Sequence, residues 1–206
     1  MFMSQRSGIF YNLINNPIIY KVIQKVMSGT SFRANIIKEN IKKKNLKILD
    51  IGCGPAEILE NIPECEYYGY DIDTRSINYA KNRFNKKNYH FYNKRFNEKA
   101  IKKLPKFDIV IFFGILHHLN DKEIKKLLNL CKKKMKKKSR LLTEDPVIIK
   151  NQNIIARSLI LKDRGKNVRK KKEYLKILKN HFKNVKPKIT HQLFIPYTWF
   201  TTVCSK

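Results

Sequence analysis

Two acids lie beside a glycine turn in an arrangement that could hold a nucleoside-type ligand. One short apolar segment ends in Gly52 and Gly54, and the next ends in Asp71. A turn without β-carbons lets a ligand touch bare backbone. An acid roughly 20 residues past such a turn can accept hydrogen bonds from ribose hydroxyls. Asp50, just before the turn, suits an ammonium group better than a phosphate. The pattern predicts a cationic, ribose-bearing ligand at the carboxyl ends of two adjacent parallel strands.

The turn lacks the third glycine that dinucleotide binding requires. A dinucleotide fingerprint has that glycine three positions after Gly54, where this chain has Glu57. The Glu57 side chain would block the close approach of a pyrophosphate, and its charge would repel one. NAD and FAD are therefore disfavoured as ligands.

Two adjacent histidines, His117 and His118, follow the nearly all-apolar segment 107–113. Such a segment is typical of a central strand that is buried on both faces. Because histidine titrates near neutral pH, either residue could take a proton from a hydroxyl acceptor. Two histidines without a nearby carboxylate constellation make a poor metal site, so we expect no metal.

Three segments resemble, in order and spacing, the motifs of class I S-adenosylmethionine-dependent methyltransferases. Residues 50–56 resemble the acidic glycine-rich motif, residues 70–72 the ribose-binding motif, and residues 107–119 the fourth-strand motif. The resemblance covers about residues 46 to 145 and implies S-adenosyl-L-methionine as the cofactor. The cofactor-binding positions that it implies are Asp50, Gly52, Cys53, Gly54, Asp71, Ile72, Phe113 and Gly114.

The chain departs from the family pattern after the third expected strand. The family usually has an acid there that binds the adenine amino group, whereas this chain has Asn93, Lys94 and Arg95. Arginine has no acceptor for that hydrogen bond. We therefore expect adenine to be held by backbone amides near Phe96 and by apolar packing, with Phe96 itself as a candidate. Ala56 replaces the third glycine of the family motif, which is a milder change.

The fourth-strand motif also concerns the methyl acceptor. Enzymes that methylate exocyclic base amines have Asn or Asp, two prolines and an aromatic residue where this chain has residues 113–116. The segment 116–119 instead resembles small-molecule methyltransferases. The resemblance implies a small-molecule acceptor, and we expect transfer to oxygen, with His117 on the substrate side and His118 on the cofactor side. In the family, this pair also often shapes the turn without proton chemistry.

A polar segment at residues 162–169 is the second candidate for substrate binding. It resembles segments in bacterial methyltransferases of small-molecule or surface-glycan type, and its arginines could bind a carboxylate or phosphate. The alternative is a structural loop tied by an Arg–Asp pair. Glu144 or Asp145 could contact the substrate or pair with Arg164. The candidate substrate residues are Asp145, Arg164, Asn167, Arg169 and Tyr197.

The elements that position these residues are expected to form one α/β domain. The resemblance implies a Rossmann-like, doubly wound, mostly parallel seven-stranded sheet with helices on both faces and added N-terminal helices. We expect strands at 48–51, 67–70, 89–92, 107–113, 140–145, 185–191 and 197–204. We expect helices at 32–44, 55–61, 75–84, 153–161 and 172–182, and another that Asp121 caps.

Within the single domain, residues 1–206, three regions are expected. Residues 1–45 form an N-terminal helical lid or cap, residues 46–145 the cofactor-binding core, and residues 146–206 the substrate-side helices and last two strands. The N-terminal helices could lie over the cofactor or pack on the sheet edge for stability only. Binding to a membrane surface is a weaker third alternative, because the polar face near residues 12–16 is not densely basic.

The formal net charge of +29 raises the alternative of a nucleic-acid partner. However, the chain is rich in Lys, Asn, Ile, Phe and Tyr together, and these residues share A/T-rich codons. Genome bias therefore explains the composition without any ligand. RNA methylation remains an alternative that the sequence does not favour, as does a non-catalytic subunit that binds S-adenosylmethionine.

Composition also indicates the compartment. The sequence has no run of about 18 uncharged apolar residues, so we expect no transmembrane helix. Residues 1–8 lack an apolar signal core. The four cysteines form no CxxC pair, which favours free thiols in a reducing environment. We therefore expect a cytoplasmic protein.

Overall fold

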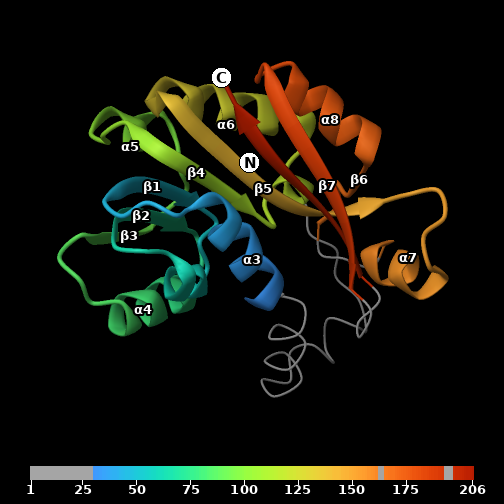
Figure 1. The fold of residues 1–206 in the computed structure, drawn as a ribbon. Helices are drawn as coiled ribbons and strands as arrows, with labels where there is room; N and C mark the ends of the chain where they lie inside the picture. Colours follow the sequence, from blue (N-terminus) through green and yellow to red (C-terminus); the bar gives the residue numbers. More distant parts are fainter. Residues whose placement is uncertain (1–29, 162–164, 193–196) are drawn as a thin grey trace.

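The most apolar segment of the sequence, β4 (Phe107–Phe113), lies in the middle of the central sheet (Figure 1). The structure, a computed structural model, describes residues 30–161, 165–192 and 197–206. Seven strands lie in the order β3-β2-β1-β4-β5-β8-β7. The other six strands are β1 (Leu46–Ile51), β2 (Cys65–Asp71), β3 (Tyr89–Asn93), β5 (Met135–Ile148), β7 (Asn184–Gln192) and β8 (Tyr197–Ser205).

Only β8 runs against its neighbours in this row of described strands, because β5 and β7 both pair with it in antiparallel register. The predicted Rossmann-like, mostly parallel seven-stranded sheet is therefore confirmed. A two-residue strand, β6 (Arg169–Lys170), pairs in parallel with the end of β5. The sequence did not predict it, since so short a segment has no recognisable period.

Helices cover both faces of the sheet, as a doubly wound fold requires (Figure 1). One face packs against α3 (Thr30–Asn40) and α4 (Thr74–Arg83). The other packs against α5 (Glu98–Lys102), α6 (Asp121–Lys134) and α8 (Lys171–Lys179). Near the end of β5, α7 (Ile154–Leu161) packs against β8. Two short 3-10 helices, η1 (Glu57–Asn61) and η2 (Leu116–His118), follow β1 and β4.

Several predicted boundaries were wrong for local reasons. The predicted helix at 55–61 is only η1, because Ala56 adopts a left-handed conformation with φ 56°. The cap of α6 is Asn120 rather than Asp121, because Asn120 and Glu123 form a reciprocal capping box. The helix predicted at 32–44 ends at Asn40. The strand predicted at 140–145 begins earlier, at Met135.

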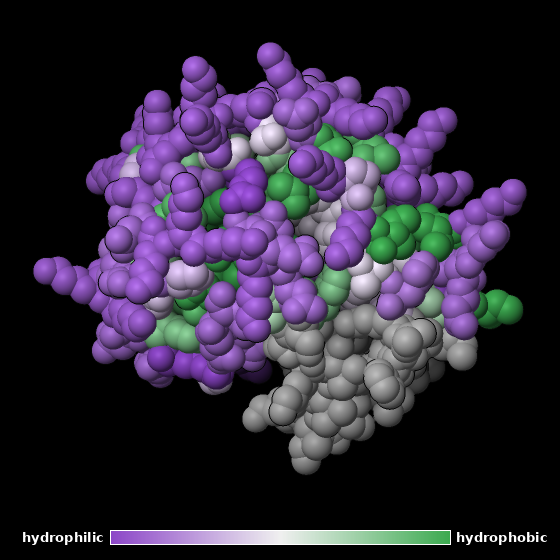
Figure 2. Space-filling view, in the orientation of Figure 1, coloured by the Kyte–Doolittle hydropathy of each residue, from purple (hydrophilic) through white to green (hydrophobic). Residues whose placement is uncertain are grey.

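The predicted N-terminal helices before Thr30 lie outside the described residues, as does Arg164. In the part of the chain that is described, no helix is long and apolar enough to cross a membrane. Hydrophilic side chains cover most of the face that Figure 2 shows, with small apolar areas between them.

Candidate active site

The glycine turn after β1 is held against the neighbouring strand. The Gly52 amide donates to the Tyr70 carbonyl at 2.7 Å. Gly52 has φ 76°, a conformation that residues with a β-carbon rarely adopt. A β-carbon at this position would lie 2.0 Å from Cδ1 of Ile115 in the turn after β4. Glycine is therefore needed both for the bend and for the close approach of the two turns.

Asp71 is fixed at the carboxyl end of β2 by two backbone amides. The Gly54 amide donates to Oδ2 at 2.8 Å, and the Asp73 amide donates to Oδ1 at 2.9 Å. Asp73 in turn caps α4 by accepting from the Ser76 amide. The Asp71 carboxylate is thus oriented between the glycine turn and the start of α4.

A cavity of about 600 Å³ lies at the carboxyl ends of β1, β2 and β4, next to α6. This volume is in the usual range for small-molecule sites. Six predicted residues line it, namely Gly52, Asp71, Ile72, Phe96, Gly114 and His118. The other predicted cofactor residues, Asp50, Cys53, Gly54 and Phe113, belong to the strands and turn that support its wall.

Apolar side chains form part of the cavity lining. Phe96 is buried, and its ring meets Tyr70 edge-on at 5.2 Å. Leu127 and Leu130 of α6 also line this cavity. Aromatic and leucine side chains can pack against a purine. The predicted packing of adenine against Phe96 stays a prediction.

Asp50 is an acid buried beneath the glycine turn. The Tyr67 hydroxyl donates to its Oδ2 at 2.5 Å. Burial raises the pKa of Asp50 from 3.8 to about 7, while the Tyr67 hydrogen bond and Arg33 oppose the rise. Near neutral pH this carboxyl therefore exists in both protonation states.

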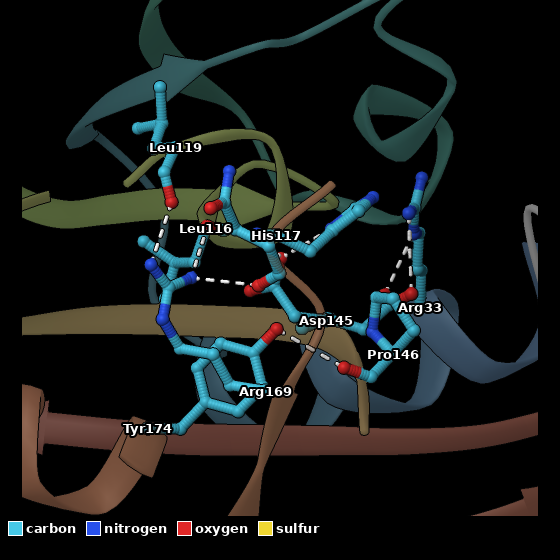
Figure 3. Close-up of polar contacts among 10 residues, drawn as sticks. Arg33, Leu116, His117, Leu119, Asp145, Pro146, Arg169 and Tyr174 are labelled. Atoms are coloured by element: carbon cyan, nitrogen blue, oxygen red, sulfur yellow. Dashed lines mark hydrogen bonds and ion pairs between the residues drawn. The ribbon is translucent and has the colours of Figure 1, made fainter. Parts of the chain in front are cut away.

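Arg33 of α3 is a site residue that the sequence did not reveal. Its Nε and Nη2 donate to the Glu144 carboxylate at 2.7 and 3.2 Å (Figure 3). Its Nη2 lies 3.5 Å from the position that a β-carbon on Gly114 would occupy. Burial alone would lower the pKa of Arg33, but the Glu144 carboxylate reverses this and raises it. Arg33 therefore stays positively charged beside Gly114, which lines the cavity.

His117 and Asp145 form a buried pair that also lies near Gly114. The His117 Nδ1 lies 2.8 Å from Asp145 Oδ1, and the His117 amide donates to the same oxygen at 3.1 Å (Figure 3). Cε1 of His117 lies 3.8 Å from the same β-carbon position on Gly114. Burial raises the pKa of Asp145, and His117 opposes that rise. A carboxylate that accepts from Nδ1 fixes the tautomer in which Nε2 can take a proton.

The two histidines occupy different places. His118 lines the cavity, whereas His117 is only 5% exposed. Their rings lie 4.1 Å apart, centroid to centroid. The structure therefore places His118 at the cavity and His117 beside the Asp145 carboxylate of β5.

The predicted substrate residues of the C-terminal part have other partners. Arg169 pairs with Asp121 and with three backbone carbonyls, so its donors are used inside the protein. This matches the predicted alternative of a structural loop tied by an Arg–Asp pair. Asn167 lies on the same loop, and its backbone N–H donates to the His117 carbonyl. Tyr197 is buried against Trp199, with ring centroids 4.6 Å apart.

Among the described residues, Glu144 binds Arg33 and Asp145 binds His117. The suggested partner Arg164 lies outside the described residues, so its pairing with either acid stays a prediction. No group of three His, Cys, Asp or Glu side chains able to hold a metal occurs in the described ranges 30–161, 165–192 and 197–206. The chemistry that the described side chains offer is ion pairing, ribose binding and proton transfer.

Comparison with known proteins gives a family for this site. A sequence profile described as "Methyltransferase domain" matches residues 42–199. The ubiquinone biosynthesis O-methyltransferase of Pelagibacter ubique (strain HTCC1062) is 34% identical over 116 residues, which cover 47% of this chain and 48% of that protein. The chain thus spans about half the length of the curated relative that it matches.

Solved structures share the fold over nearly the whole chain. A SAM-dependent methyltransferase from Archaeoglobus fulgidus superposes with a TM-score of 0.68 at 18% identity, covering 91% of this chain and 99% of that one. The mitomycin 7-O-methyltransferase MmcR superposes with a TM-score of 0.66 at 14% identity, covering 97% of this chain and 61% of that one. At such identities the likeness concerns the fold alone.

Proposed function

Because the chain belongs to the family of methyltransferase domains, we propose that it transfers a methyl group from S-adenosyl-L-methionine to an oxygen atom of a small-molecule acceptor. This family is the one that the three sequence motifs predicted. The observation that carries the proposal is the Asp71 carboxylate, held by the Gly54 amide at the edge of a cavity of about 600 Å³. An anchored carboxylate beside bare glycine backbone fits a ribose better than a phosphate.

The charges around the cavity suit the two ends of a methionine group. Asp50 supplies an anion below the turn, and Arg33 supplies a cation beside Gly114. We assign the cofactor's ammonium group to Asp50 and its carboxylate to Arg33. Phe96, Ile72 and the leucines of α6 are assigned to the adenine.

The bound cofactor supplies a methyl group activated on a sulfonium, so the protein mainly aligns the acceptor and excludes water. An acceptor hydroxyl forms its new bond to the methyl carbon while the carbon–sulfur bond breaks and its electrons stay on sulfur. The hydroxyl proton goes to Nε2 of His117, and Asp145 stabilises the imidazolium that results. His118 remains on the cofactor side.

The roles of Arg164, Asn167 and Tyr197 toward the acceptor, and of the N-terminal region as a lid, remain part of this proposal. So does a cytoplasmic location, which the four free, buried cysteines support.

Binding of the methyl donor and of its demethylated product, measured by calorimetry, tests the core of the proposal. The wild type is expected to bind both, and Asp71→Asn is expected to weaken binding about tenfold or more, since hydrogen bonds to a charged group are lost. Asp108→Asn is the matched control, because Asp108 lies near the opposite end of β4 and pairs with Lys136. Failure of the wild type to bind either compound would overturn the proposal.

Transfer of a labelled methyl group separates the acceptor classes. Label is expected in a metabolite extract, and less of it in the His117→Gln variant. Label in RNA alone would favour the second candidate, RNA methylation, whose support is the net charge of +29. Binding without transfer to either would favour a non-catalytic subunit. Full transfer by both His117→Gln and His118→Gln would exclude both histidines as the base.

A further inference from the structure

The turn that carries His117 is held from two sides, and Arg169 provides much of one side. Nη1 of Arg169 donates to the Leu116 carbonyl at 3.0 Å, and Nη2 donates to the Leu119 carbonyl at 2.8 Å (Figure 3). The Asp121 carboxylate anchors the same guanidinium, with Oδ1 at 2.6 Å from Nη2. Arg169 is only 8% exposed. The guanidinium therefore bridges both ends of the turn.

Asp145 provides the other side. Its Oδ1 accepts from both the amide and the Nδ1 of His117. Asp145 belongs to β5 and Arg169 to β6, and these strands pair in parallel with Val147 opposite Arg169. Asp145 and Arg169, which contact the His117 turn from its two sides, thus belong to two paired strands.

The backbone before Arg169 lies directly on His117. The Asn167 amide donates to the His117 carbonyl at 3.0 Å. A β-carbon at Gly165 would lie 2.1 Å from Cδ2 of His117 and 2.6 Å from its carbonyl oxygen. Glycine at position 165 is what allows this contact.

The three-residue helix η2 makes few hydrogen bonds of its own, among them the one from the Leu119 amide to the Leu116 carbonyl at 3.2 Å. Buried carbonyls need hydrogen-bond partners. Those of Leu116, His117 and Leu119 accept from residues 167 and 169. Tyr174 lies against the guanidinium, 5.8 Å from ring centroid to Cζ, and its hydroxyl donates to the Pro146 carbonyl next to Asp145.

We propose that Arg169 is a positioning residue that acts through His117. It fixes the 116–119 turn so that Nδ1 of His117 stays on Asp145 and Nε2 keeps the direction in which it receives a proton. Arg169 itself does not touch the acceptor in this role, which differs from the predicted binding of a carboxylate or phosphate. The inference rests on the proposed function in one respect, namely that His117 is the base.

The proton on Nδ1 of His117 provides a direct readout by NMR of the whole chain. A proton held between an imidazole and a carboxylate gives a downfield resonance that exchanges slowly with water, and His117→Gln identifies it by its loss. In Arg169→Lys this proton is expected to exchange about tenfold faster or more, because hydrogen bonds to a charged group are lost. In Arg140→Lys exchange should be unchanged. Arg140 is a matched control, since it also donates to a helix-end carbonyl, that of Asn40 at 2.6 Å.

An Arg169→Lys protein that is folded and keeps the wild-type resonance and exchange rate would overturn the proposal. Should that variant not fold, Asp121→Asn replaces it, because the Asp121 side chain is 75% exposed and its change only loosens the anchor of the guanidinium. Faster exchange of the same proton supports the role of Arg169, and an unchanged rate overturns it. Binding of the demethylated cofactor product is measured in parallel. If the wild type does not bind this product, the proposed function fails. The exchange of the His117 proton tests only the role of Arg169.

Discussion

The Tyr67 hydroxyl donates to Oδ2 of Asp50 at 2.5 Å, beneath the turn that we assign to the cofactor. Both side chains are buried. Burial raises the pKa of Asp50 to about 7, and the Tyr67 hydrogen bond limits that rise. Tyr67 therefore helps to keep ionised an acid that the proposed function needs as an anion.

Affinity for the cofactor is expected to rise from pH 6 to pH 8. Asp50 loses its proton through a pKa of about 7, and only the carboxylate attracts the cofactor's ammonium group. The gain is about tenfold if the neutral acid contributes nothing. Calorimetry of wild type and Asp50→Asn at pH 6, 7 and 8 measures it. The variant should show a flat profile, and equal slopes in both proteins would contradict the assignment.

Asp50→Asn is also expected to stabilise the cofactor-free protein at pH 8. The pKa of Asp50 in the fold is above its ordinary value of 3.8, so the folded protein holds this proton more tightly than the unfolded chain. The stability from that proton is complete below about pH 4 and is lost as the pH rises to about 7. Asparagine does not ionise. The free energy of unfolding of Asp50→Asn minus that of the wild type should increase by on the order of 2 kcal/mol as the pH rises from 5 to 8. Urea unfolding at both pH values measures this, and a constant difference would contradict it.

The sequence predicted the core of the fold because its signals are local. β4 runs from Phe107 to Phe113, as predicted, since it is the chain's clearest apolar strand. The start of α6 was wrong by one residue because Asn120 and Asp121 are both good caps. Only the reciprocal bond between Asn120 and Glu123 decides between them.

The site was less predictable where its partners are distant in sequence. Arg33 and Glu144 are 111 positions apart. Arg33 is also one cation among 45 Lys and Arg residues, so its residue type gave no signal. Asp71 was found because its distance from the glycine turn is set by one strand–helix–strand unit. The role of Arg169 follows only from its contacts with the Leu116 and Leu119 carbonyls, which lie 53 and 50 positions away in the sequence.

Arg33→Met is expected to destabilise the protein by about 3–5 kcal/mol, because it leaves Glu144 buried without its cation. The double variant Arg33→Met/Glu144→Met should recover most of that loss, since an apolar pair can replace a buried ion pair. Chemical denaturation of the wild type and both variants gives the comparison. A double variant as unstable as the single one would show that the cost does not come from the stranded carboxylate.

The same double variant separates stability from binding. If Arg33 holds the cofactor's carboxylate, the folded double variant should bind the demethylated product about tenfold more weakly or worse, because a charge-assisted hydrogen bond is lost. Calorimetry at equal pH and salt measures the difference. Wild-type affinity in the double variant would leave Arg33 with a structural role alone.

Gly52→Ala is expected to destabilise the protein more than Gly54→Ala does. Both glycines have positive φ, at 76° and 53°. A left-handed conformation costs alanine about 1–2 kcal/mol in either case. Only at Gly52 would the new methyl group also meet a neighbour, Cδ1 of Ile115 at 2.0 Å, whereas at Gly54 nothing lies within 4 Å. Overpacking of this kind adds about 1–3 kcal/mol.

Ile115→Ala identifies that extra cost. In the Ile115→Ala background, the additional methyl at position 52 no longer meets Cδ1 or Cγ1 of Ile115. The penalty of Gly52→Ala should therefore fall by about 1–3 kcal/mol, while the penalty of Gly54→Ala stays the same. Urea unfolding of the wild type, Gly52→Ala and Gly54→Ala, each with and without Ile115→Ala, measures both differences. Equal penalties of Gly52→Ala in the two backgrounds would show that the contact between the β1 and β4 turns does not limit which residue position 52 accepts.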